Sequence, residues 1–211
     1  PRLCRDWSSD VCSSDLTMNS ILIQRTTKET DINLTLNIRG LGEFKGTSNI
    51  GFFDHMLTLL CKHAGWDIAL TMQGDIEVDD HHSIEDVGIV LGLALAKALE
   101  DKSSLARYGD CFLPMDEALA HVIVDVSGRS TLVFDARLDK VMLGSMSSEM
   151  VKEFFKAVAF NAQLTLHMRL LYGENTHHCV EALFKGFARA IKSATTIDPT
   201  IQGVLSSKGV L

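Results

Sequence analysis

Hydrophobic residues recur along this chain with two periods, one of two residues and one of three to four. The shorter period is typical of half-buried strands, and the longer one of helices that bury one side. Alternation predicts strands over residues 32–38, 68–72, 120–126, 132–136 and 164–170. Helical spacing predicts four helices: one after Gly51, one capped by Asp79 or Asp80, one over 150–160 capped by Ser147 or Ser148, and one capped by Asn175 or Thr176.

The order strand, helix, strand, helix occurs twice, and a Phe-Phe pair begins the middle helix both times. This repetition predicts an α/β fold of mixed α+β type, made of two duplicated sheet and helix-pair halves over about residues 18–105 and 106–211. We expect the halves to pack as one domain spanning residues 18–211. Residues 1–17 show no sustained period and no signal-peptide core, so we expect a non-native or disordered extension there.

Composition narrows the classes of function. The 211 residues are 46% hydrophobic and carry a formal net charge of -7, which argues against general binding to nucleic acid. The longest apolar run, residues 87–99, is interrupted by glycines and a lysine, so no membrane span is expected. Five cysteines form no C-x-x-C pair, which favours a reducing, cytoplasmic location. An anionic substrate requires a local cationic site on such a chain.

The tetrad His-His-x-x-Glu is the most informative motif and opens a predicted helix both times. It occurs as His81, His82 and Glu85, and again as His177, His178 and Glu181. In each copy the first histidine and the glutamate are four residues apart and share a side of the helix, while the second histidine points about 100° away. One helix can therefore contribute to two metals.

Imidazole and carboxylate ligands together suit divalent first-row metals. Manganese suits a ligand set that includes carboxylates in this proportion. If each metal takes the His-Glu pair of one helix and the adjacent histidine of the other, the two ligand sets are His81, Glu85, His178 and His177, Glu181, His82. Candidates for a fourth ligand are His55 and Glu153. The positions that remain open favour catalysis, because substrate or water can enter and be polarised.

Longer motifs resemble the imidazoleglycerol-phosphate dehydratase family of histidine biosynthesis, from about Ile21 to Leu211. They are Phe52-Phe53-Asp54-His55-Met56-Leu57, Asp80-His81-His82-Ser83-Ile84-Glu85-Asp86, Ser127-Gly128-Arg129, Gly173-Glu174-Asn175-Thr176-His177-His178 and Glu181-Ala182-Leu183-Phe184-Lys185. The resemblance implies a lyase that dehydrates D-erythro-imidazole glycerol phosphate to imidazole acetol phosphate at two Mn(II) ions. It also implies a duplicated fold of the ribosomal protein S5 domain 2-like type and a homo-oligomer of 24 subunits with active sites between subunits.

The resemblance extends to the residues that handle the substrate. It implies substrate contacts from the metal-binding histidines, from Glu85, and from Glu29, Arg107, Arg129, Ser206, Ser207 and Lys208. Arginine, lysine and hydroxyl groups are what a phosphate needs. Catalysis is implied for Glu29, His81, Glu85, His177 and Glu181, and Glu29 is our candidate for the acid-base role. Glu153 departs from the family pattern, in which a metal-binding histidine commonly precedes the second Phe-Phe pair.

Two rival functions are a metal-storage shell without catalysis and a metal-dependent phosphoester hydrolase. The hydrolase is not favoured, because the Asp-x-Asp-x-Thr nucleophile motif of the phosphatase sometimes fused to such dehydratases is absent from the sequence. Storage does not require phosphate-binding residues. Inertness toward imidazole glycerol phosphate, combined with loading of many ions per subunit, would favour storage.

Overall fold

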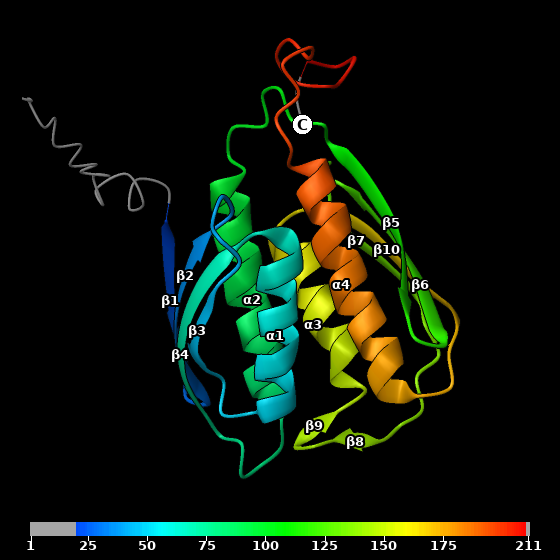
Figure 1. Ribbon diagram of the computed structural model, residues 1–211. Helices are drawn as coiled ribbons and strands as arrows, with labels where there is room; N and C mark the ends of the chain where they lie inside the picture. Colours follow the sequence, from blue (N-terminus) through cyan, green and yellow to red (C-terminus); the bar gives the residue numbers. More distant parts are fainter. Residues whose placement is uncertain (1–19, 210–211) are drawn as a thin grey trace, which may run out of the picture.

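The computed structural model describes residues 20–209, so the expectation for residues 1–17 lies outside the described residues. Residues 20–209 form two four-stranded sheets that enclose four helices (Figure 1). The first half contains β1 (Ile21–Thr26), β2 (Thr30–Asn37), β3 (Phe44–Thr47), α1 (Gly51–Ala64), β4 (Asp67–Gly74) and α2 (His81–Ala98). The second contains β5 (Tyr108–Met115), β6 (Ala118–Asp125), β7 (Thr131–Asp135), the short β8 (Met142–Leu143) and β9 (Met146–Ser147), α3 (Met150–Asn161), β10 (Thr165–Tyr172) and α4 (Thr176–Ala194).

The two sheets have the same topology, which confirms the duplicated α/β fold. Their strand orders are β1-β2-β4-β3 and β5-β6-β10-β7. In the first sheet β3 runs parallel to β4, and in the second β7 runs parallel to β10; the other neighbours are antiparallel. Four layers result: α1 and α2 cover the first sheet, α3 and α4 cover the second, and the helix layers meet in the middle.

The position of each middle helix relative to the strand that follows it gives a residue-by-residue match between the halves. α1 is followed by Gly65 at φ 74°, and α3 is followed shortly by Gln163 at φ 55°. Both residues precede a buried side chain that leads into the next strand. His55 and Glu153 each lie ten residues before the positive-φ residue (65 − 55 and 163 − 153), so they occupy equivalent positions.

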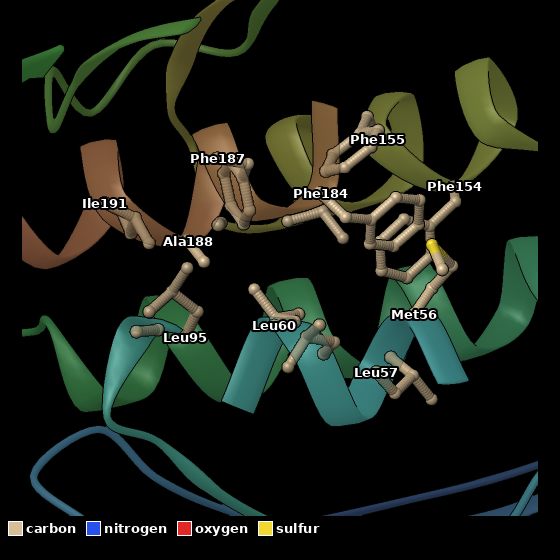
Figure 2. Close-up of a cluster of buried hydrophobic side chains, with 14 of the residues drawn as sticks. Met56, Leu57, Leu60, Leu95, Phe154, Phe155, Phe184, Phe187, Ala188 and Ile191 are labelled. Atoms are coloured by element: carbon tan, nitrogen blue, oxygen red, sulfur yellow. The ribbon is translucent and has the colours of Figure 1, made fainter. Parts of the chain in front are cut away.

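The centre of the molecule is a continuous hydrophobic core formed where the helix layers meet (Figure 2). Its aromatic part joins α3 to α4: the ring of Phe184 lies 5.3 Å from that of Phe154 and 4.7 Å from that of Phe155, measured between centroids. Phe155 also contacts Phe187 edge to face at 5.3 Å. Aromatic pairs at such separations add to the stabilisation that burial provides. This packing holds α4, which carries the second tetrad, against α3, which carries Glu153.

Two glycines allow α2 and α3 to approach closely. A Cβ on Gly88 would lie 2.9 Å from Ala157 Cβ and from Phe154 O, and one on Gly92 would lie 2.7 Å from Asn161 Cβ. These separations are shorter than van der Waals contact, so a larger residue would push the helices apart. The close approach holds Glu153 of α3 beside the first turns of α2.

Some local expectations are wrong. Three of the four edge strands of the two large sheets, β1, β3 and β5, were not predicted, whereas the fourth, β7, was. α3 has no side-chain cap, and Ser148 donates to the backbone of Asp139 instead. At the start of α2 the side chain of Asp80 makes no capping bond, but Oδ1 of Asp79, the other predicted cap, accepts the N–H of His81 at 2.8 Å. Asn175 caps α4 as predicted. None of the helices within residues 20–209 is long and apolar enough to cross a membrane.

Candidate metal centre

The first turn of α4 is fixed by the side chain of Asn175. Its Oδ1 accepts the N–H groups of His177 at 2.9 Å and His178 at 3.4 Å. These bonds satisfy donors that the start of a helix leaves free. One helical turn later, Glu181 returns to the side of His177, and Nε2 of His177 lies 3.1 Å from Oε1 of Glu181. The predicted sharing of one side by the second His-Glu pair is confirmed.

His55 reaches the same carboxylate from α1. Its Nε2 lies 2.9 Å from Oε1 of Glu181. Ligand atoms of His55, His177 and Glu181 all lie within 4.8 Å of one another, and residues 20–209 contain no second group of three potential ligands this close. Two imidazole nitrogens and one carboxylate oxygen suit a divalent first-row metal. The residues therefore fit the metal that the sequence predicts.

Glu181 is 5% exposed and carries its charge in a largely buried place. Burial raises its pKa, but hydrogen bonds from Lys185, His55 and His177 outweigh burial and bring the pKa to about 2. The carboxylate is therefore ionised at neutral pH. A cation between the two imidazoles and this carboxylate would replace the contacts that the two rings now make with Oε1 of Glu181.

The first tetrad forms a similar but looser arrangement on α2. Nε2 of His81 lies 3.6 Å from Oε2 of Glu85, so this His-Glu pair also shares one side of its helix. Glu153 of α3 lines the same surface groove as His81. Its Oε2 lies 3.0 Å from Nζ of Lys156, which raises the pKa of Lys156, with a smaller contribution from Glu85. Glu153 thus stands beside the first tetrad as His55 stands beside the second.

The second histidine of each tetrad is held away from these groups. Nδ1 of His82 lies 2.9 Å from Oδ2 of Asp75, and Nδ1 of His178 lies 2.7 Å from Oε2 of Glu117. The expected sets, in which the His-Glu pair of one helix joins the second histidine of the other, do not form within the described part of one chain. Oε2 of Glu29 lies 3.9 Å from Nδ1 of His82, so the expected acid-base residue borders this histidine.

The residues expected to bind phosphate lie near the C-terminal end of α4, whereas the second tetrad lies at its N-terminal end. Arg107 donates from its backbone to the oxygen of Ala194, the last residue of α4, whereas His177 lies in the first turn. A helix of 19 residues is about 28 Å long. Figure 1 likewise shows the C-terminal segment beyond the end of α4, opposite the end at which all four helices begin.

The donors of Arg107 are already engaged. Its guanidinium binds both carboxylate oxygens of Asp125, at 2.8 and 3.2 Å, and the backbone oxygen of Leu205 at 2.6 Å. The last contact anchors the segment that carries Ser206, Ser207 and Lys208. Arg129 is more available, because its side chain is 67% exposed and its Nη2 lies 3.9 Å from Asp125.

Comparison with known proteins identifies the family. The imidazoleglycerol-phosphate dehydratase family model matches residues 48–191. The chain belongs to this family. An imidazoleglycerol-phosphate dehydratase from Acetivibrio thermocellus is 54% identical over 189 residues, which cover 90% of this chain and 97% of that protein. One from Ruminiclostridium cellulolyticum is 52% identical over 92% of this chain and the full length of the relative.

Solved structures of the family have the same fold. The crystal structure of imidazoleglycerol-phosphate dehydratase from Staphylococcus aureus matches with a TM-score of 0.78 at 42% identity, covering 85% of this chain and 99% of that one. The enzyme from Pyrococcus furiosus, solved in complex with (S)-C348, matches with a TM-score of 0.76 at 38% identity, over 90% and 100% of the two chains. As a member of the imidazoleglycerol-phosphate dehydratase family, the chain is a hydro-lyase of histidine biosynthesis.

Three side chains near the predicted ligands were missed by sequence reasoning: Asp75, Glu117 and Lys185. Lys185 lies four residues after Glu181, so helical spacing could have found it. Asp75 follows a strand, and Glu117 lies 61 residues before its histidine in the turn between β5 and β6. No spacing rule connects either carboxylate to its histidine.

Proposed function

We propose that this chain dehydrates D-erythro-imidazole glycerol phosphate to imidazole acetol phosphate with two Mn(II) ions per active site. The observation that carries the proposal is the convergence of His55, His177 and Glu181 on one small volume. Three protein ligands leave several positions of an octahedral ion free for substrate and water. A divalent ion held there supplies Lewis-acid polarisation of the substrate.

The second proposed metal position consists of His81, Glu85 and Glu153. Its support is the equivalence of Glu153 and His55 in the two halves, together with the groove shared by His81 and Glu153. This position offers one nitrogen and two carboxylate oxygens, whereas the first offers two nitrogens and one oxygen. Oxygen-rich sets suit harder ions such as Mn(II), so Glu153 is compatible with the metal. Lys156 must release Glu153 when an ion binds.

We propose further that a second copy of the chain completes each metal position. His82 and His178 are directed toward Asp75 and Glu117 rather than toward the groups of their own chain. The length of α4 also separates the metal residues of one chain from its phosphate residues by much more than the length of the substrate. Both observations favour active sites between subunits, in an assembly that the resemblance suggests has 24 copies. A cytoplasmic location remains the expectation from the sequence.

The proposed roles of the remaining residues follow from their chemistry. Arg129 and Lys208, with the hydroxyls of Ser206 and Ser207, supply charge and hydrogen bonds to the phosphate group. Arg107 holds the segment that carries Ser206, Ser207 and Lys208. Its positive charge also offsets the negative charge of Asp125. Glu29 is the proposed base for the proton that must leave the substrate carbon, because its carboxylate lies 3.9 Å from Nδ1 of the tetrad residue His82.

The test is formation of imidazole acetol phosphate from imidazole glycerol phosphate, measured by chromatography. Manganese-loaded wild type is compared with metal-stripped protein and with His177→Ala. His167→Gln is the matched control, because His167 lies on the outer side of β10, opposite the buried Leu166 and Met168. We expect product from the wild type and the control only. Metal loading without product would favour storage, and release of inorganic phosphate would favour the hydrolase.

A further inference from the structure

His82 and His178, which face away from the glutamates of their own tetrads, each contact a carboxylate through the same ring nitrogen. Each uses Nδ1 to bond a carboxylate, His82 with Asp75 and His178 with Glu117. An ionised carboxylate can only accept a hydrogen bond, so Nδ1 carries the proton. In the neutral imidazole, Nε2 then keeps its lone pair and points away from the carboxylate. The same atomic arrangement therefore exists once in each half.

The two carboxylates do not occupy equivalent positions of the duplicated fold. Asp75 directly follows β4 in the first half, whereas Glu117 lies in the turn between β5 and β6 in the second. The residue that matches Asp75 in the second half is Gly173 (75 + 98), which has no side chain to offer. The position that matches Glu117 in the first half, directly before the second strand, is occupied by Glu29, whose Oε2 lies 3.9 Å from Nδ1 of His82. Each half therefore places a carboxylate of this turn near its second histidine, and the first half adds the closer contact between His82 and Asp75.

A gain in folding stability does not explain the orientation of the Asp75 side chain. Its Oδ2 bonds His82, but its Oδ1 is buried without a hydrogen-bond partner among the described residues. A buried carboxylate oxygen without a partner is costly. Retention of such a group in contact with a histidine of the tetrad indicates a role for the histidine.

We infer that Asp75 and Glu117 are positioning residues, which hold His82 and His178 in the tautomer and orientation that present Nε2 to a metal. The inference rests on the proposed function and deepens it. A histidine ligand commonly donates its other ring N–H to a carboxylate, and loss of that partner weakens metal binding by about 10- to 100-fold. Neither carboxylate contacts the metal in this arrangement.

Glu117 offers the sharper test, because its two oxygens have different partners. Oε1 accepts the backbone N–H of Asn175 at 2.8 Å and of Glu174 at 3.3 Å, while Oε2 faces His178. In Glu117→Gln the amide oxygen must stay with the backbone donors, so the NH₂ group faces Nδ1. His178 then has to accept at Nδ1 and carry its proton on Nε2, which can no longer bind a metal.

Asp75→Asn makes a different prediction from the same reasoning. Oδ1 of Asp75 has no partner, so the amide of the variant can turn its oxygen toward His82 and keep the proton on Nδ1. Only the charge of the partner is lost. We expect a smaller loss of metal affinity than in Glu117→Gln.

The experiment is calorimetric titration of Mn(II) into the metal-stripped full-length protein. Asp110→Asn is the matched control, because Asp110 is 65% exposed and lies 3.7 Å from Nε2 of His121, a histidine outside the proposed metal ligands, so its replacement removes the same charge elsewhere. We expect Glu117→Gln to weaken one of two Mn(II) sites by about 10- to 100-fold, and Asp110→Asn to change neither by more than about twofold. The thermal midpoint of the metal-free proteins should be similar.

Other outcomes would overturn the inference in distinguishable ways. Unchanged affinity in a folded Glu117→Gln protein would mean that Glu117 only supports the loop before α4. A lowered thermal midpoint with equal weakening of both sites would mean the same. Failure of the wild type itself to bind Mn(II) would instead refute the proposed function, because the titration of the wild type does not depend on any change at Glu117.

Discussion

Replacement of Gly88 by valine tests whether the close contact between α2 and α3 supports the second metal position, formed by His81, Glu85 and Glu153. Any Cβ at residue 88 would lie 2.9 Å from both Ala157 Cβ and Phe154 O, about 0.5 to 1 Å inside ordinary contact. Relief requires α2 and α3 to move apart around this contact. Overpacking of this kind costs about 1 to 3 kcal/mol, and a β-branched residue recovers little of the helix propensity that glycine lacks.

Such a loss is measurable as a shift of the thermal midpoint of the metal-free protein. One kcal/mol corresponds to about 2 to 4 °C for a chain of this size, so we expect a decrease of about 2 to 12 °C. Gly88 lies one turn after Glu85, and the separation of the helices moves Glu153 away from Glu85 and His81. Mn(II) affinity at this position should therefore decrease, while the position at His55 is retained.

Leu93→Val is the control for this measurement, because it places a β-branched residue on the exposed side of the same helix. We expect a change of less than about 0.5 kcal/mol for the control. Equal thermal midpoints and equal Mn(II) binding in Gly88→Val and wild type would refute the reasoning. They would show that α3 yields to the added side chain without moving Glu153.

Three further predictions concern the core, the base and the metal ligand. Phe184→Ala should lower the free energy of unfolding by about 3 to 5 kcal/mol, measured in urea, because it empties the centre of the aromatic cluster; a loss below 1 kcal/mol would contradict that packing. Glu29→Gln should lower kcat by about 10²- to 10⁴-fold with unchanged Mn(II) content, and loss of manganese would assign Glu29 to the metal instead. Glu153→His should shift the competition between Zn(II) and Mn(II) toward Zn(II) at one position only, measured by metal analysis after equilibration with both ions; an unchanged ratio would remove Glu153 from the ligands.

The sequence predicted those features that depend on spacing along one element. The i, i+4 pairing of His177 with Glu181 follows from the pitch of a helix, and so does the pairing of His81 with Glu85. The cap of α4 by Asn175 is equally local. These features require no knowledge of how the helices pack.

What the sequence could not predict depends on contacts between distant segments. The spacing left open which tetrad His55 joins, and only the packing of α1 against α4 brings it to Glu181. The partners of His82 and His178 come from a strand end and from a turn, so no period links them to the tetrads. Arg107 was expected to face a phosphate, but Asp125, 18 residues away, already occupies its guanidinium.

The duplicated fold keeps the expected metal residues of one chain far from its expected phosphate residues. Duplication places both tetrads at the end where all four helices begin, while the phosphate residues follow the opposite end of α4. The substrate carries its imidazole and its phosphate on one short chain of carbon atoms, so it cannot reach both ends of a helix about 28 Å long. Two copies arranged so that the start of α4 in one meets the Arg107 end of the other would remove this separation. Assembly would then be a condition of catalysis, and a variant that stays monomeric should retain its fold but not its activity.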